Sequence, residues 1–102
     1  MYVCGGWSSG VAFNSVERLD PNVSPGSWET VAAMHIPRCD AAAAAVLGQL
    51  YVFGGDTAAQ SYVEATQSAE VFQPASNAWV ACEHMTMRRS GATAAALLYR
   101  YG

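Results

Sequence analysis

Apolar and polar residues alternate along this chain in short runs separated by turns rich in glycine or proline, the pattern of half-buried β-strands. The runs at 2–4 and 51–53 are β-prone, and Gly-Gly closes each of them. The runs at 16–19 and 69–72 alternate apolar with charged residues before a proline-containing turn. Two further pairs of strands are predicted at 28–31 with 79–82 and at 41–47 with 92–98.

The strands come in pairs because one sequence unit is written twice. Tyr-Val-Cys-Gly-Gly at 2–6 returns as Tyr-Val-Phe-Gly-Gly at 51–55, and Ser-Val-Glu at 15–17 returns as Ser-Ala-Glu at 68–70. Three single residues return at a constant displacement of 51: Trp28 as Trp79, Met34 as Met85, and Arg38 as Arg89. A repeat of about 50 residues with four antiparallel strands predicts the blade of a β-propeller.

One segment gives a conflicting local signal. Asp40 followed by five alanines and then Val46, Leu47 and Gly48 resembles a helix capped at both ends. A helix of about seven residues is marginal in water, however, and Gly48-Gln49 offers a two-residue hairpin turn of type II′. We therefore predict a strand over 41–47.

Composition excludes several classes of protein. The chain has 52% hydrophobic residues and a net charge of −3, so it is neither disordered nor suited to nucleic acid. No apolar run approaches the length of a membrane span, and the N-terminus does not look like a signal peptide. The three cysteines form no CxxC pair, which argues against zinc and disulfides and favours a cytoplasmic location.

At the repeated positions the sequence resembles the kelch repeat. That family's blade carries a strand ending in Gly-Gly, a Ser-Val-Glu-like strand with Asp-Pro, then Trp, Met and Pro-Arg before the next innermost strand. The first copy matches at 2–6, 14–21, Trp28, Met34 and 37–38. The matching positions of the second copy are 51–55, Ser68, Glu70, Pro74, Trp79, Met85 and Arg89.

The resemblance implies an all-β, partial kelch-type β-propeller with four-stranded antiparallel blades. With strands named A to D from the channel outward, the order is B-C-D, A-B-C-D, A. Residues 1–36 are expected to form strands B to D of a first blade, 37–86 a complete second blade, and 87–102 the innermost strand of a third.

Two blades are too few to close a propeller, which typically has four to eight. The open sheet edges favour self-association unless they are protected. Three explanations stay open: the chain is a fragment of a longer kelch protein, it assembles with copies of itself, or it is a poorly stable product. Three copies would supply a six-bladed ring.

The repeat assigns structural roles to its invariant positions. We expect the glycine pairs to allow close strand packing, the tryptophans to lie in the core between blades, and the arginines to anchor strands through backbone carbonyls. These structural residues are Gly5, Gly6, Gly54, Gly55, Trp28, Trp79, Arg38 and Arg89.

The resemblance also implies where a partner binds: just before each innermost strand and in the loop after Gly-Gly. Such loops carry binding residues on a rigid scaffold. An acidic residue at position 40 favours a cationic partner segment. The partner-binding residues predicted in this way are Cys39, Asp40, Ser90, Trp7, Ser8 and Asp56.

The sequence contains no nucleophile–base–acid arrangement, no metal-ligand spacing and no cofactor motif. We therefore expect a non-catalytic module that binds a protein or peptide, with no cofactor, nucleic acid or membrane partner. The resemblance implies a substrate adaptor of a cullin-based ubiquitin ligase as the specific form. The alternatives are a fragment of an oxidase-like kelch enzyme and an actin-binding or structural kelch protein.

Overall fold

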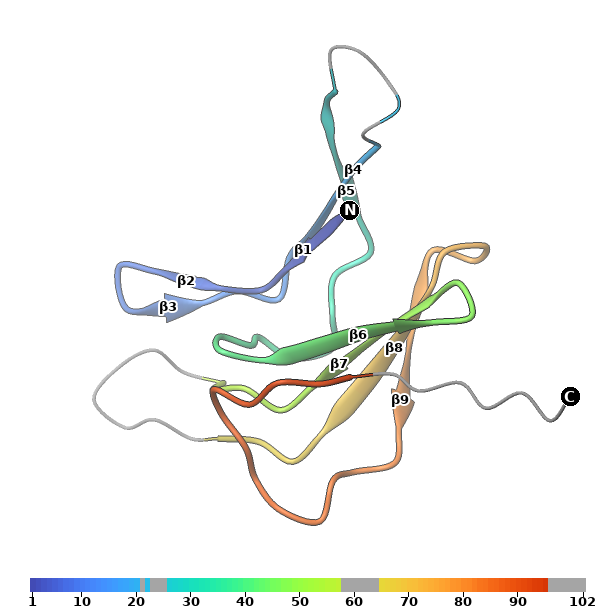
Figure 1. Cartoon of the computed structure of the whole chain (residues 1–102). Helices are drawn as coiled ribbons and strands as arrows, with labels where there is room; N and C mark the ends of the chain where they lie inside the picture. The colour runs from blue at the N-terminus through green and yellow to red at the C-terminus, as the bar shows by residue number, and fades with distance from the viewer. Residues whose placement is uncertain (21, 23–25, 58–64, 96–102) are drawn as a thin grey trace, which may run out of the picture.

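The computed structural model describes the chain except for residues 21, 23–25, 58–64 and 96–102, and the described part is all β (Figure 1). The strands are β1 (Tyr2–Cys4), β2 (Trp7–Ser8), β3 (Val11–Ala12), β4 (Val16–Leu19), β5 (Trp28–Val31), β6 (Ala42–Val46), β7 (Gln49–Phe53), β8 (Ala69–Gln73) and β9 (Ala78–Cys82). The part of the chain that the structure describes has no helix capable of crossing a bilayer.

Two antiparallel sheets follow the two sequence repeats. The first has the order β1-β4-β5 and the second the order β6-β7-β8-β9, so each strand pairs with the next strand of its own sheet along the chain. The small hairpin β2-β3 is an additional element of the first repeat. The two sheets stand side by side at a steep angle, as consecutive blades of a partial β-propeller (Figure 1). The predicted fold class is confirmed.

The alanine-rich segment forms strand β6, as predicted, because it pairs along its whole length with β7. The turn between them lies one residue earlier than expected. Leu47 and Gly48 are its central residues, and both have positive φ (49° and 78°), as a type I′ turn requires. The predicted type II′ turn at Gly48-Gln49 is therefore wrong, because Gln49 already pairs with Val46.

Two other segments differ from the sequence-based expectation. The loop predicted after the first Gly-Gly contains the hairpin β2-β3, whose turn at Ser9-Gly10 also has positive φ at both residues (51° and 79°). The innermost strand of a third blade was predicted over 92–98. Residues 92–95 form no strand, and the remainder of that segment lies outside the described residues.

The repeat is visible in individual backbone hydrogen bonds. The Gly6 amide donates to the carbonyl of Arg38, and the equivalent Gly55 amide donates to the carbonyl of Arg89, both at 2.8 Å. A Cβ atom at Gly5 would overlap the Arg38 carbonyl oxygen. Only glycine at position 5 therefore lets the segment that follows β1 lie this close to the backbone at Arg38.

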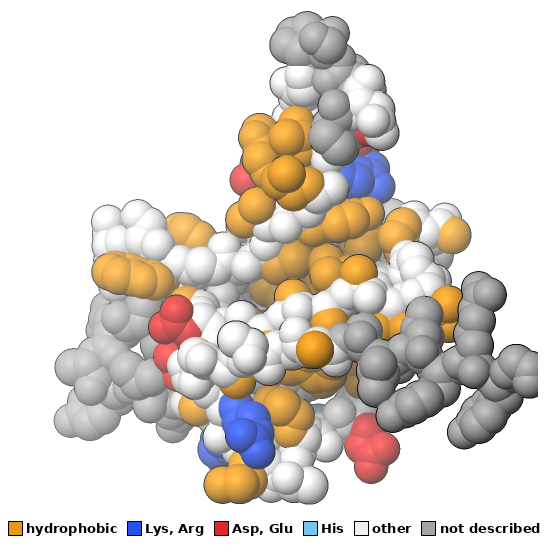
Figure 2. Space-filling model, viewed as in Figure 1, with side chains coloured by type: hydrophobic (Ala, Val, Ile, Leu, Met, Phe, Trp, Pro, Cys, Tyr) orange, Lys and Arg blue, Asp and Glu red, His pale blue; other side chains and the backbone are white. Residues whose placement is uncertain are grey.

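The interface between the two sheets, which we call the seam, holds the hydrophobic core. Trp79 is 6% exposed, its ring centroid lies 5.2 Å from that of Phe72, and its Nε1 donates to the Ala32 carbonyl at 2.8 Å. Tyr2 of the first sheet meets Phe72 edge-on at 5.6 Å. The space-filling view shows apolar side chains gathered between the sheets (Figure 2). The buried cluster consists of Val16, Val31, Met34, Val52, Phe72 and Trp79.

Arg38 crosses the same seam and is 1% exposed. Its Nη1 donates to the carbonyls of Gly54 at 2.8 Å and Ser68 at 3.0 Å, and its Nη2 donates to Ser68 Oγ and to Glu70 Oε2. The other carboxylate oxygen of Glu70 accepts the His35 amide at 2.7 Å. The ion pair is therefore fully enclosed and fully hydrogen-bonded.

The repeat equivalents of Trp79 and Arg38 are not in the same environment. Trp28 was predicted to lie in the core between blades, yet it is 48% exposed. Arg89 was predicted to bond backbone carbonyls, yet its side chain is exposed and makes no hydrogen bond within the described residues. The reason is the same for both. Each needs the face of an adjoining blade, and among the described residues only the seam between the two sheets provides one.

Trp79→Ala is expected to lower the free energy of unfolding by about 3–5 kcal/mol, because it removes a buried aromatic ring and its hydrogen bond to Ala32. Trp28→Ala is the matched control at the equivalent, exposed position and is expected to cost much less. Urea denaturation followed by circular dichroism measures both. Equal losses would show that Trp79 does not hold the seam.

Arg38→Ala is expected to cost about 3–5 kcal/mol, because Glu70 would remain buried without its cation. Arg88→Ala, at an exposed arginine that makes one exposed hydrogen bond to the Ala65 carbonyl, is expected to change stability by no more than about 0.5 kcal/mol. Chemical denaturation of the two variants tests this difference. A stable Arg38→Ala chain would contradict the assigned role of the ion pair.

Candidate functional site

The predicted partner-binding residues lie where the innermost strands begin and where the Gly-Gly strands end. Cys39 and Asp40 precede β6, Asp56 follows β7, and Ser90 precedes residues 92–95. Figure 1 shows the start of β6, the end of β7 and the hairpin β2-β3 on the same side of the molecule. We call the cluster of Cys39, Asp40, Asp56 and Ser90 the rim.

Backbone hydrogen bonds hold the rim together. Cys39 and Asp56 form a two-way antiparallel bridge, with N···O distances of 2.9 Å and 2.7 Å. The Gly91 amide donates to the Asp40 carbonyl at 2.9 Å. Segments that are far apart in sequence therefore share one fixed geometry, because each loop is tied to its neighbour through main-chain atoms.

Asp56 is the buried acid of the rim, with 6% of its surface exposed. Ser90 Oγ donates to Asp56 Oδ2 at 2.6 Å, a short bond of the kind that a charged acceptor makes. The Oδ1 atom of Asp56 is buried and has no hydrogen-bond partner among the described residues. Within that part of the chain, the carboxylate retains an acceptor atom without a donor.

Asp40 is the exposed acid of the rim and has a left-handed backbone conformation, with φ of 54°. Aspartate tolerates that conformation better than most residues do. The surrounding main chain fixes its position through the bond from Gly91. An exposed carboxylate on a fixed backbone is suited to accept hydrogen bonds from a cationic group.

Trp7 and Ser8 lie apart from the rim, in hairpin β2-β3. Trp7 is 61% exposed, and its repeat-equivalent position is that of Asp56. Within the described residues, no hydrogen bond or ion pair connects Trp7 or Ser8 with the four rim residues. The structure therefore brings together four of the six predicted binding residues and places the other two on a neighbouring loop of the same side.

The thiol of Cys39 is poorly suited to nucleophilic chemistry. Burial raises its pKa, and the negative charges of Asp56 and Asp40 raise it further. Burial alone raises the pKa of Cys4 to about 11. Because the thiolate is the reactive form, both cysteines are held as neutral thiols near neutral pH. The described residues contain no cluster of His, Cys, Asp or Glu that could hold a metal ion.

The sequence reasoning did not assign Glu70 a role. The repeated Ser-x-Glu motif contained the signal, because a glutamate between the apolar residues of strand β8 requires a cation when it is buried. The bond between Ser90 and Asp56 was also not foreseen. The two residues are 34 positions apart, and no local pattern links them.

The native chain is expected to react slowly with iodoacetamide at pH 8. At that pH, the fraction present as thiolate is about 100-fold lower for a thiol of pKa about 11 than for one of pKa about 9. Unfolding in urea removes the burial and should accelerate alkylation of Cys4 and Cys39, which mass spectrometry of peptides resolves. Rapid alkylation of Cys39 in the native chain would contradict the neutral buried thiol.

Comparison with known proteins gives consistent matches. The family profile of the Kelch motif matches residues 1–35 and 37–86. An F-box/kelch-repeat protein of Arabidopsis thaliana is 34% identical over 79 residues, covering 78% of this chain and 16% of that protein. Kelch-like ECH-associated protein 1B of Danio rerio is 32% identical over 90 residues, covering 88% of this chain and 15% of that protein.

Among solved structures, that of YjhT matches with a TM-score of 0.70 at 23% identity. The match covers 88% of this chain and 29% of the YjhT chain. At this identity the likeness concerns the fold. The chain spans less than a third of each of these three proteins.

Proposed function

The chain belongs to the Kelch motif family, and on that basis we propose that it is a non-catalytic module for binding a protein or peptide. The observation that carries the proposal is the rim. Four predicted binding residues from three loops meet on a scaffold whose strands are fixed by the buried seam. Fixed loops at one side of a rigid sheet framework are a recurrent form of binding surface.

A substrate adaptor of a cullin-based ubiquitin ligase is the specific role we propose. The similarity to an F-box/kelch-repeat protein and to a Kelch-like ECH-associated protein supports it. In such a role the kelch part holds the substrate, while another domain of the protein contacts the ligase. In this role the rim would form part of the surface that binds the substrate.

The charge of the rim indicates the chemistry of the bound segment. Asp40 offers an exposed carboxylate, and the buried carboxylate of Asp56 adds negative charge to the rim. The chain as a whole carries a net charge of −3. A segment containing lysine or arginine would donate hydrogen bonds to the exposed Asp40 carboxylate, and complementary charge favours both encounter and register.

Asp40→Ala is expected to weaken binding of a lysine- and arginine-containing peptide by about two- to fivefold, the equivalent of one exposed charge contact. The melting temperature should fall only slightly, because Asp40 is exposed and the one cost is that alanine tolerates its left-handed backbone less well. Fluorescence anisotropy with peptide arrays of basic, neutral and acidic segments identifies and measures the binder. Glu83→Ala, which removes an exposed acid next to β9, is the matched control.

Binding that is unaffected by Asp40→Ala, or a preference for acidic peptides, would contradict the cationic partner. Unfolding caused by Asp40→Ala would show instead that this residue belongs to the scaffold. The proposed adaptor role is tested separately, by ubiquitylation of a captured partner in a reconstituted ligase that contains the full-length protein.

A further inference from the structure

Each end of the chain carries one half of the seam that the two repeats form between them. At the seam, the first repeat contributes Arg38 and Met34, and both are almost fully buried. The second repeat contributes the acceptors of Arg38 and the aromatic ring of Trp79. Because the sequence unit occurs twice in the chain, each of these two contributions also has a repeat equivalent elsewhere in the same chain.

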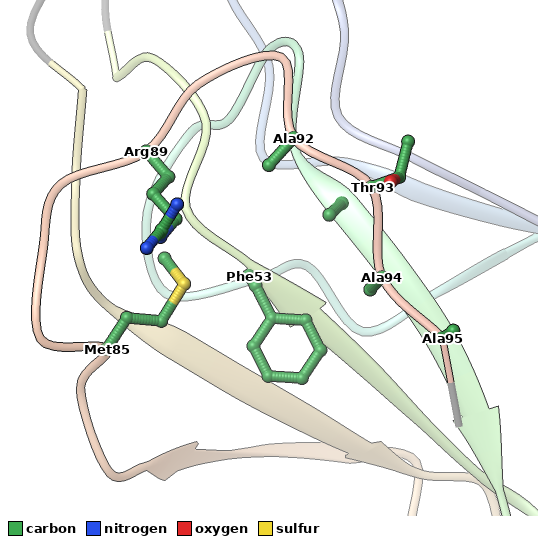
Figure 3. A pocket seen from close by; sticks show the side chains of 8 residues that line it. Phe53, Met85, Arg89, Ala92, Thr93, Ala94 and Ala95 are labelled. Atoms are coloured by element: carbon green, nitrogen blue, oxygen red, sulfur yellow. The ribbon is translucent and has the colours of Figure 1, made fainter. Parts of the chain in front are cut away.

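The repeat equivalent of the surface around Arg38 and Met34 lies at the C-terminal end. Arg89 and Met85 are the equivalents of Arg38 and Met34, but Arg89 is exposed and Met85 only half-buried. Together with Phe53 they line a pocket of about 350 Å³ beneath residues 92–95 (Figure 3). Within the described residues, the guanidinium of Arg89 has no hydrogen-bond partner. This surface is the tail.

The repeat equivalent of the surface that holds the acceptors of Arg38 lies at the N-terminal end. Glu17 is the equivalent of Glu70, and its carboxylate is exposed and unpaired among the described residues. Val3 and Trp28, the equivalents of the buried Val52 and Trp79, are 49% and 48% exposed. The carbonyl of Gly5 and the side chain of Ser15 occupy the positions of the remaining Arg38 acceptors. This surface is the head.

We propose that the head of one copy of this chain binds the tail of a second copy and reproduces the internal seam between two molecules. Arg89 would donate to Glu17, Ser15 and the Gly5 carbonyl of the second copy. Trp28 of that copy would donate its Nε1 to the Glu83 carbonyl, as Trp79 does to Ala32 within one chain.

Three features of the two surfaces select this occupant. The unpaired charges are opposite in sign, a guanidinium on the tail and a carboxylate on the head. Each carries apolar groups, Met85 on the tail and Val3 and Trp28 on the head, that are more exposed than their repeat equivalents in the buried cluster of the internal seam. In the internal seam, where the equivalent surfaces meet, the guanidinium of Arg38 finds acceptors on Gly54, Ser68 and Glu70. In a longer chain, a neighbouring repeat would occupy the same surfaces.

Such an interface is heterologous, since the two copies contribute different surfaces, and it can therefore propagate from one copy to the next. Light scattering coupled to size exclusion should show that the wild-type chain gains mass as its concentration rises. Arg89→Ala removes the donor of the tail, and Glu17→Gln removes the charge of the head. Each variant alone should weaken association about 30-fold or more and elute as a folded monomer.

A 1:1 mixture of the two variants provides the decisive measurement. The Glu17→Gln chain keeps an intact tail and the Arg89→Ala chain keeps an intact head, so one wild-type seam can form between them. The mixture should give a heterodimer and nothing larger, which native mass spectrometry identifies. Arg88→Ala, which alters a side chain that donates to the Ala65 carbonyl of the same molecule, should associate like the wild type.

A wild-type chain that stays monomeric up to about 100 µM, far above the dissociation constants of specific interfaces, would overturn the proposal. It would also fail if both variants associated like the wild type, because open strand edges rather than the seam would then join the copies. A mixture that remains monomeric would exclude the head-to-tail geometry. Circular dichroism of each variant checks that the sheets are intact.

Discussion

The structure depends on one buried cation. Arg38 enters the seam almost without solvent contact, so every donor of its guanidinium needs an acceptor from the second sheet. Gly54, Ser68 and Glu70 provide them, and all three are parts of strands or strand ends in the second repeat. A shift of one sheet against the other would leave a buried charge unpaired. The ion pair therefore determines how the sheets are placed.

The apolar part of the seam has a different effect. Burying Phe72 and Trp79 against the first sheet stabilises the pair of blades in proportion to the area removed from water, but such contacts are not directional. Two sheets joined only by apolar side chains could slide past each other with a modest loss of energy. The apolar cluster supplies most of the stabilisation, while the Arg38 network and the hydrogen bond of Trp79 to Ala32 supply the geometry.

The sequence predicted what the repeat itself determines and failed where the surroundings decide. Strand β6 was predicted against its helix propensity because the repeat placed a strand there, and its pairing with β7 bears this out. Trp28 and Trp79 hold identical positions in the repeat but differ in burial, since burial depends on whether another sheet covers the residue. The bond from Ser90 to Asp56 joins two loops at a separation that no local pattern encodes.

Scaffold and rim are joined at consecutive residues, which explains how a buried ion pair can determine an exposed surface. Arg38 is held in the seam, and Cys39 and Asp40 follow it directly in the chain. Gly6 binds the Arg38 carbonyl, Asp56 binds Cys39 through two backbone hydrogen bonds, and only then does the chain enter β6. The backbone that carries the Asp40 carboxylate is consequently coupled to the seam. Rim variants should therefore alter affinity, whereas seam variants remove the platform on which the rim is built.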